Sequence, residues 1–158
     1  MIDHVTLDVS SHPTSRSFYE RALAPLGWSI VAEWPGGCGF GMTRGGPTFW
    51  LRQDGRPSSP IHLAFRAGSR AAVHAFHEQA LLWGGRANGE PGLRDYHDDY
   101  YGAFILDPDG HNVEAVCHEA PGPATGPGAS SADDHDASSA DDAGDDPADD
   151  DDASEHDE

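Results

Sequence analysis

Apolar and polar residues alternate in two short segments of the chain, at residues 4–9 and 62–67. In the first segment, Val5, Leu7 and Val9 share one side of an extended chain, and the polar residues share the other. Because the side chains of a strand alternate between the two faces of a sheet, each segment is predicted to be a half-buried strand. The apolar side of each strand is expected to face a hydrophobic core.

A helical pattern follows each of these strands, and shorter strands follow each helix. Phe18, Ala22 and Leu26 recur every four residues after Pro13, a residue that is favourable at a helix start. The second helical pattern ends at the two glycines of residues 84–85, since glycine commonly ends a helix. Further strands are predicted at residues 28–34, 37–43, 48–53, 86–88, 101–106 and 112–118.

The two halves of this pattern are copies of one unit. Residues 4–27 and 62–85 are identical at seven of 24 positions when they are aligned without gaps. About one or two identities would be expected from ordinary residue frequencies. The economical explanation is a duplicated βαβββ module, at about residues 1–55 and 59–118. We predict an α+β fold in which the two modules form a cupped mixed sheet, with the helices on its outer face.

Beyond the second module, the composition changes abruptly. Residues 121–158 contain no Val, Ile, Leu, Met or aromatic residue, and they carry 14 acidic residues with no Lys or Arg. A segment of this kind cannot bury enough apolar surface to offset the entropy that is lost on ordering. We therefore predict one domain over residues 1–120, followed by a disordered acidic tail over residues 121–158.

The charge of the chain excludes several functions. Its formal net charge is −19, and it contains no lysine. A Walker-type phosphate loop and a Schiff-base mechanism both need a lysine, and an acidic chain is a poor partner for nucleic acid or an anionic membrane. No apolar run approaches the roughly 20 residues that cross a bilayer, and we expect a cytoplasmic protein. Cys38 and Cys117 are too few for a disulfide framework and are expected to be small buried residues.

Three potential metal ligands occupy corresponding places in the two modules. His4 and His62 lie on the first strands of the modules, and Glu114 lies in the last strand between Val113 and Ala115. By strand alternation all three point away from the helices, so a cupped sheet brings two imidazoles and one carboxylate together. Such a set with open coordination positions suits Fe2+, and Mn2+, Zn2+ or Ni2+ use the same donors. The alternative is two core histidines and an ordinary strand carboxylate.

Three residues near these ligands are candidates to bind the substrate. Trp50 occupies the position in the first module that Glu114 occupies in the second, so three protein ligands and open positions for substrate are expected. Arg52 and Arg66 share the predicted pocket face and are candidates to clamp a substrate carboxylate. For Arg66, an ion pair with Asp8, which occupies its repeat-related position, is the alternative.

A stretch rich in tyrosine, DYHDDYYG, precedes the predicted strand at 101–106. Tyr96, Tyr100 and Tyr101 are expected to line the mouth of the pocket, with Tyr101 in contact with substrate. His97 is a candidate general acid/base because histidine titrates near neutral pH. An ordinary loop anchored by packed tyrosines is the alternative.

The segment GGCGFG at residues 36–41 concentrates four glycines in a predicted strand. Its spacing does not match the dinucleotide-binding fingerprint in any register. The glycines instead predict a strand bend or a close approach of the backbone to other groups.

The candidate ligands lie in segments that resemble a known superfamily. His4 in IDHV, His62 in PIHLAF and Glu114 in DPDGHNVEAV, with the duplicated module over about residues 1–118, resemble the vicinal oxygen chelate superfamily. This superfamily holds glyoxalase I, extradiol dioxygenases, fosfomycin-resistance proteins and bleomycin-resistance proteins. The resemblance implies a divalent metal that chelates two neighbouring oxygens of a small-molecule substrate. Many members are homodimers, some with modules exchanged between chains, so the two modules are expected to meet either within one chain or across a dimer.

The resemblance favours one branch of the superfamily. Glyoxalase I has a fourth metal ligand, a carboxylate in the first module, and this chain has Trp50 at that position. A glyoxalase-like lyase or isomerase is therefore the second hypothesis. Fosfomycin-resistance enzymes need a cationic pocket, and the chain has no lysine. Extradiol dioxygenases match the ligand set best and use an acid/base histidine, for which His97 is the candidate; Fe2+ is then the favoured metal. Bleomycin-resistance proteins bind their drug without a metal, so the alternative of a different class is a non-catalytic protein that binds and sequesters a small molecule.

Overall fold

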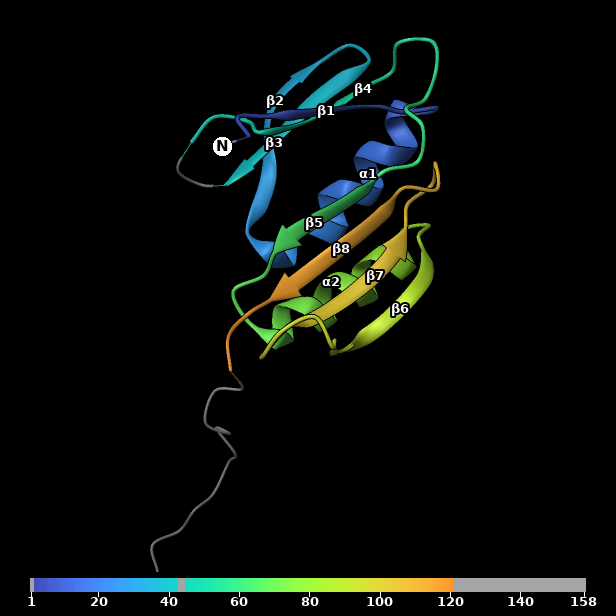
Figure 1. The fold of residues 1–158 in the computed structure, drawn as a ribbon. Coiled ribbons are helices and arrows are strands. Elements are labelled where there is room, and N and C mark those ends of the chain that lie inside the picture. Colours follow the sequence, from blue (N-terminus) through green and yellow to red (C-terminus); the bar gives the residue numbers. More distant parts are fainter. Residues whose placement is uncertain (1, 43–44, 121–158) are drawn as a thin grey trace, which may run out of the picture. The chain divides into compact units, whose positions relative to one another are not determined.

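The computed structural model describes residues 2–42 and 45–120 (Figure 1). The predicted tail, residues 121–158, lies outside the described residues. The first module consists of β1 (Val5–Asp8), α1 (His12–Leu23), the short 3-10 helix η1 (Ala24–Leu26), β2 (Trp28–Trp34), β3 (Gly37–Met42) and β4 (Phe49–Arg52). The second consists of β5 (His62–Arg66), α2 (Arg70–Leu82), β6 (Arg86–Leu93), β7 (Tyr101–Leu106) and β8 (Asn112–Cys117).

Each module builds its own four-stranded mixed sheet, in the order β1-β4-β3-β2 and β5-β8-β7-β6. The strand that begins each module pairs in parallel with the strand that ends it, β1 with β4 and β5 with β8. The other strand pairs are antiparallel. The predicted α+β fold of two βαβββ modules is therefore confirmed, with the strands divided into two sheets. The registers also correspond, since Thr6 pairs with Trp50 as Ala64 pairs with Glu114. Trp50 thus stands in the first module where Glu114 stands in the second.

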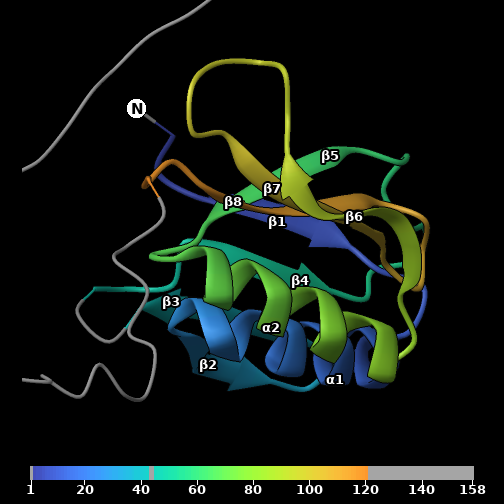
Figure 2. The same cartoon turned by 90° about the horizontal axis from the view of Figure 1, so that it is seen from below.

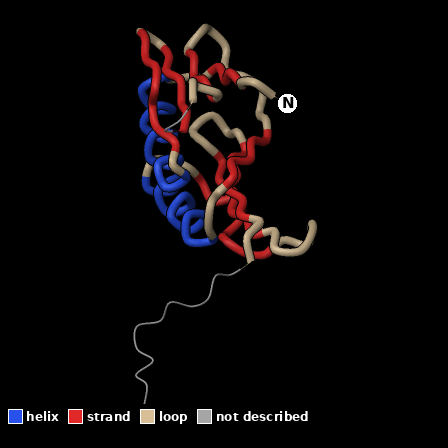
Figure 3. The backbone as a smooth tube through the Cα atoms, turned by 90° about the vertical axis from the view of Figure 1, so that its left-hand side faces the viewer, coloured by secondary structure: helices blue, strands red, loops and turns tan. Residues whose placement is uncertain are grey.

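Both helices lie on one side of the strands, where they pack against each other and against the sheets (Figures 2 and 3). Apolar side chains from both modules join in one core between helices and sheets. The centroid of the Phe65 ring in β5 lies 5.3 Å from that of Trp28 and 5.4 Å from that of Phe49, both in the first module. The opposite face of each sheet is left without a helix, and we call it the open face.

Strand β6 is longer than predicted, reaching Leu93 rather than ending near residue 88. The sequence pattern did not predict a strand at residues 89–93, because Gly89 and Pro91 are unfavourable in strands. The strand lies at the edge of its sheet, where a proline without an N–H is tolerated. Its pairing with β7 is irregular near Gly89 and between Gly89 and Gly92.

Both cysteines are buried and unpaired, as predicted. Burial raises the pKa of the Cys38 thiol to about 11. Among the described residues, neither helix is long and apolar enough to span a membrane.

Candidate functional site

His62 and Glu114 form a close pair on the adjacent strands β5 and β8. Nε2 of His62 is 3.1 Å from Oε2 of Glu114, and Nδ1 of His62 is 3.1 Å from the backbone oxygen of Asn112. The Glu114 side chain is only 1% exposed, whereas half of the His62 side chain is exposed. Within the described part of the chain, His62 is the only ion-pair partner of this carboxylate. Burial of a carboxylate is costly unless hydrogen bonds and an opposite charge compensate it, and a cation bound beside His62 would supply that charge.

The spacing of this pair also suits two ligands of one metal ion. Bonds of about 2.1 Å that meet at a right angle place their two donor atoms about 3 Å apart. Nδ1 of His62 is held by Asn112, 3.1 Å from its backbone oxygen and 2.9 Å from its side-chain nitrogen, and Nε2 faces the carboxylate. The residues of the second module therefore fit two of the three predicted ligands.

Tyr100 holds the other oxygen of Glu114. Its hydroxyl donates a hydrogen bond of 2.6 Å to Oε1. Burial, together with this carboxylate, raises the pKa of Tyr100 to about 12, so the phenol remains a donor near neutral pH. Gly102 provides the space for the carboxylate, because a Cβ at this position would lie 2.9 Å from Oε1. Sequence reasoning missed Gly102, whose only signal was a glycine inside a predicted strand.

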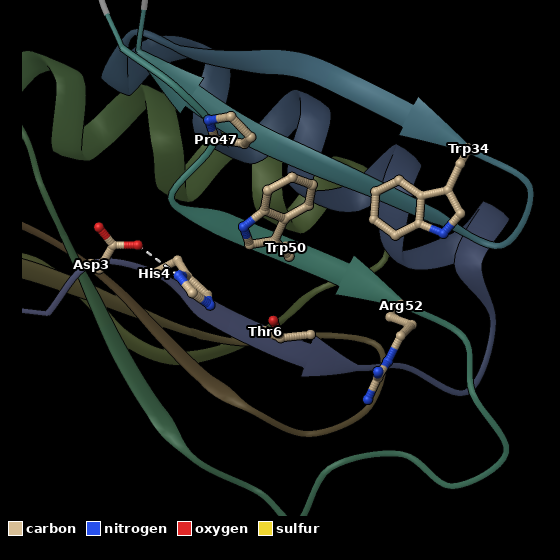
Figure 4. Close-up of a pocket in the computed structure, with 7 residues that line it drawn as sticks. All are labelled: Asp3, His4, Thr6, Trp34, Pro47, Trp50 and Arg52. Carbon is tan, nitrogen blue, oxygen red and sulfur yellow. Dashed lines mark hydrogen bonds and ion pairs between the residues drawn. The ribbon is translucent and has the colours of Figure 1, made fainter.

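His4 lies in an open pocket on the open face of the first module (Figure 4). The pocket has a volume of about 350 Å³, within the range of small-molecule sites. Nδ1 of His4 is 2.7 Å from Oδ1 of Asp3, and more than half of the His4 side chain is exposed. The pocket is lined by Asp3, His4, Thr6, Trp34, Pro47, Trp50 and Arg52.

The three predicted ligands do not converge within one chain. Across residues 2–42 and 45–120, no three His, Cys, Asp or Glu side chains form a group that could hold a metal ion. The structure brings His62 and Glu114 together and places His4 in the pocket of the other module. The cause is the division of the strands into two sheets, each with its own open face.

The two arginines differ in their surroundings. Arg52 lines the pocket as predicted, but its Nε and Nη2 donate hydrogen bonds of 2.7 and 3.1 Å to the two oxygens of Asp8. These hydrogen bonds hold the pKa of Asp8 below its usual value. Arg66 does not pair with Asp8; it is exposed, and its Nη2 lies 3.7 Å from Glu119. The expected Asp8–Arg66 alternative is therefore wrong, because parallel pairing of β1 with β4 sets Asp8 beside Arg52.

Tyr101 faces helix α2 rather than the pocket mouth. Its hydroxyl is 2.7 Å from Nε2 of His74, and it shares a side of β7 with Ala103 and Ile105, which are fully buried. The predicted contact of Tyr101 with substrate is corrected by strand alternation, which turns residue 101 toward the helix.

Tyr100 connects His97 to Glu114. The ring of His97 stacks on that of His118 at 5.0 Å and contacts the ring of Tyr100 at 5.1 Å. Tyr100 in turn donates to Glu114. An acid/base role of His97 stays a prediction, with Tyr100 as the group that connects it to the carboxylate.

Comparisons with known proteins agree with this architecture. Residues 1–115 match the family described as the Glyoxalase/Bleomycin resistance protein/Dioxygenase superfamily. A glyoxalase/bleomycin resistance protein from Albidiferax ferrireducens T118 is 30% identical, with a TM-score of 0.63 over 73% of this chain and 96% of its own. A glyoxalase-related enzyme from Fulvimarina pelagi is 18% identical, with a TM-score of 0.60 over 74% of this chain and 87% of its own, and shows the fold alone. No curated protein matches the chain significantly.

Proposed function

Because this chain belongs to the glyoxalase/bleomycin resistance protein/dioxygenase superfamily, we propose that it is a metal-dependent enzyme acting on a small substrate with two neighbouring oxygen atoms. The observation that carries the proposal is the pair of His62 and Glu114, whose nitrogen and oxygen are 3.1 Å apart. The carboxylate is buried, and its charge is best balanced by a cation held jointly with the imidazole.

His4 of a second copy of the chain is the third ligand in this proposal. Within one chain His4 stays apart from the pair, although His4 and His62 occupy equivalent positions on the two open faces. In a twofold symmetric dimer, the first module of each chain faces the second module of its partner, which creates two identical sites. Each site then contains one His4 from one chain, with His62 and Glu114 from the other.

A bound divalent ion, with Fe2+ favoured and Mn2+, Zn2+ or Ni2+ accepted by the same donors, would serve as a Lewis acid and as a template for the two substrate oxygens. The chain's own residues orient the ligands. Tyr100 restrains Oε1 of Glu114 and leaves Oε2 beside His62. Trp50 occupies the position of a fourth protein ligand, and its indole does not bind metal. Coordination positions are therefore left open for substrate.

Among the reactions of this superfamily, we favour an extradiol-type ring-cleaving dioxygenase. Proton transfer in a glyoxalase-like isomerisation needs a base at the fourth ligand position, and the indole of Trp50 cannot supply one. His97, whose ring contacts that of Tyr100, is the candidate acid/base histidine for this reaction. A glyoxalase-like lyase or isomerase is the second candidate reaction.

One observation favours a function of a different class. The pocket of the first module, with two tryptophans and a volume of about 350 Å³, is formed without the His62–Glu114 pair. A non-catalytic protein that sequesters a small molecule would need this pocket and no metal.

The metal content of the purified full-length chain separates these functions. We expect about one metal per chain, lost in His62→Ala and retained in His74→Ala, whose imidazole lies on α2 beside Tyr101. The Fe2+-loaded protein is then expected to consume oxygen with members of a catechol panel. Metal without oxygen consumption on any catechol favours the lyase or isomerase. A protein that takes up no metal, yet binds small molecules, contradicts the enzymatic proposal.

A further inference from the structure

The glycine-rich segment of the first module lies against two tryptophans that line the pocket. In β3, Cys38 and Phe40 are fully buried in the core, so by strand alternation Gly37 and Gly39 lie on the open face. A strand with two bare positions on one face leaves a shallow depression in the sheet. The glycines therefore allow other groups to approach the backbone of β3 closely, which is one of the two roles predicted for them.

Two indole rings occupy that depression. A Cβ on Gly37 would lie 2.1 Å from Cζ2 of Trp34, and a Cβ on Gly39 would lie 2.7 Å from Cε3 of Trp50. Each ring thus lies across one glycine, at a distance that no side chain at that position would permit. The ring centroids of Trp34 and Trp50 are 5.6 Å apart (Figure 4). We call these two rings the tryptophan platform; it covers one wall of the pocket, and Trp34 keeps 39% of its surface exposed.

The charges around the platform do not favour an anion. The only cationic side chain that lines the pocket in the described chain, Arg52, already holds Asp8 and lies 3.8 Å from Asp54. At the other end, Asp3 is almost fully exposed beside His4. In the metal-free chain, these three carboxylates and one guanidinium leave a net negative charge around the pocket. An anionic ligand would therefore meet repulsion and no free arginine.

We propose that the tryptophan platform binds the planar aromatic ring of a ligand that carries no anionic group, and that a positive charge on the ring strengthens binding. Stacked aromatic rings attract each other beyond their buried area, and tryptophan is the best aromatic partner for a cation. The inference rests on the proposed function insofar as the bound ring is that of the substrate. It deepens that function by favouring, at the platform, a neutral or cationic ring over one with a carboxylate or phosphate.

The test uses the full-length chain after removal of metal with EDTA, with binding measured by isothermal titration calorimetry. Three bicyclic probes of similar size differ in charge: N-methylquinolinium, quinoline, which is neutral near neutral pH, and 2-naphthoate. We expect N-methylquinolinium to bind most tightly and quinoline more weakly. The affinity for 2-naphthoate is expected to be lower than that for N-methylquinolinium by about tenfold or more.

Variants locate the binding at the platform. Trp50→Leu and Gly39→Ala are expected to weaken N-methylquinolinium binding by about tenfold. Trp83→Leu removes an exposed indole that lies under Arg21 instead, and Gly68→Ala adds a methyl group where no atom lies within 4 Å. Both controls are expected to bind as the wild type does, and thermal unfolding of every variant checks that it is folded.

The outcomes separate this inference from the metal proposal. Equal affinity for 2-naphthoate and N-methylquinolinium, no binding of any probe, or wild-type affinity in Trp50→Leu overturns the inference. A wild-type protein that binds N-methylquinolinium and takes up no metal leaves the platform intact and contradicts the proposed enzyme.

Discussion

The hydroxyl of Tyr19 in α1 donates a hydrogen bond of 2.7 Å to Oδ2 of Asp107, in the turn between β7 and β8. Tyr19 is fully buried and Asp107 is 1% exposed, so this bond joins the two modules through their interior. The other oxygen of Asp107 accepts from the backbone N–H groups of Asp109 and His111. A helix of the first module is thus tied to the turn that precedes the strand of Glu114.

Tyr19→Phe tests this connection. The variant leaves one buried carboxylate oxygen without its donor, so the free energy of unfolding is expected to fall by about 1–3 kcal/mol. Urea denaturation followed by circular dichroism measures the change. Tyr96→Phe, at a tyrosine that is 69% exposed, is the control and is expected to be neutral. Equal stability of both variants and the wild type would show that the cross-module bond contributes nothing.

The ion pair of Asp8 and Arg52 predicts a dependence of stability on pH. Hydrogen bonds from Arg52 lower the pKa of Asp8 in the folded chain, so the stabilisation is complete above the unfolded pKa of about 3.9. It is lost as the pH falls through the lower, folded value. The stability difference between the wild type and Asp8→Asn is therefore expected to be constant near neutral pH and to shrink on acidification. Urea denaturation over a pH series measures it, and a difference that grows as the pH falls contradicts the assignment.

The strand pattern was sufficient to predict the modules and the equivalence of Trp50 with Glu114, because both follow from local alternation and from the repeat. The alternative that paired Asp8 with Arg66 was wrong, because Arg52 is the partner of Asp8. That choice depends on which strands are neighbours, and the parallel pairing of β1 with β4 decides it. The prediction for Tyr101 was wrong because Tyr101 shares the helix-facing side of β7 with Ala103 and Ile105.

The failure of the three ligands to meet within one chain has a tertiary cause. His62 and Glu114 lie in the strands predicted for them and His4 directly precedes β1, but local patterns do not determine whether two modules share one sheet or form two. Contacts between α1 and α2 and the shared core fix how the modules pack. Such contacts join residues far apart in sequence and leave no periodic signal.

The close fit of Gly102 against Glu114 predicts a loss of metal affinity on substitution. In Gly102→Ala the new methyl group would lie 2.9 Å from Oε1 and displace the carboxylate from Tyr100. Metal affinity is expected to fall by about tenfold or more, as for other groups that orient a ligand. Titration of the metal-free protein with Zn2+ measures this, with Gly68→Ala as the control. Unchanged affinity in Gly102→Ala would place the metal, if bound, away from Glu114.

The Cys38 thiol is expected to be unreactive in the folded protein. Burial raises its pKa to about 11, so almost none of it is thiolate near neutral pH. In a Cys117→Ser background, a disulfide reagent is expected to react with Cys38 only after denaturation. Rapid reaction of the native protein would show that the strand β3 opens readily.

The central claim is that one metal site combines His4 of one chain with His62 and Glu114 of another, and mixed dimers test it most directly. Chains carrying His4→Ala and chains carrying Glu114→Gln are co-expressed with different affinity tags, and the heterodimer that carries both tags is purified. Each mutant homodimer is expected to bind no metal. The heterodimer has one site with both substitutions and one with none, so it is expected to bind one metal ion per dimer. A heterodimer without metal, beside a wild-type dimer with two, contradicts ligands shared between chains.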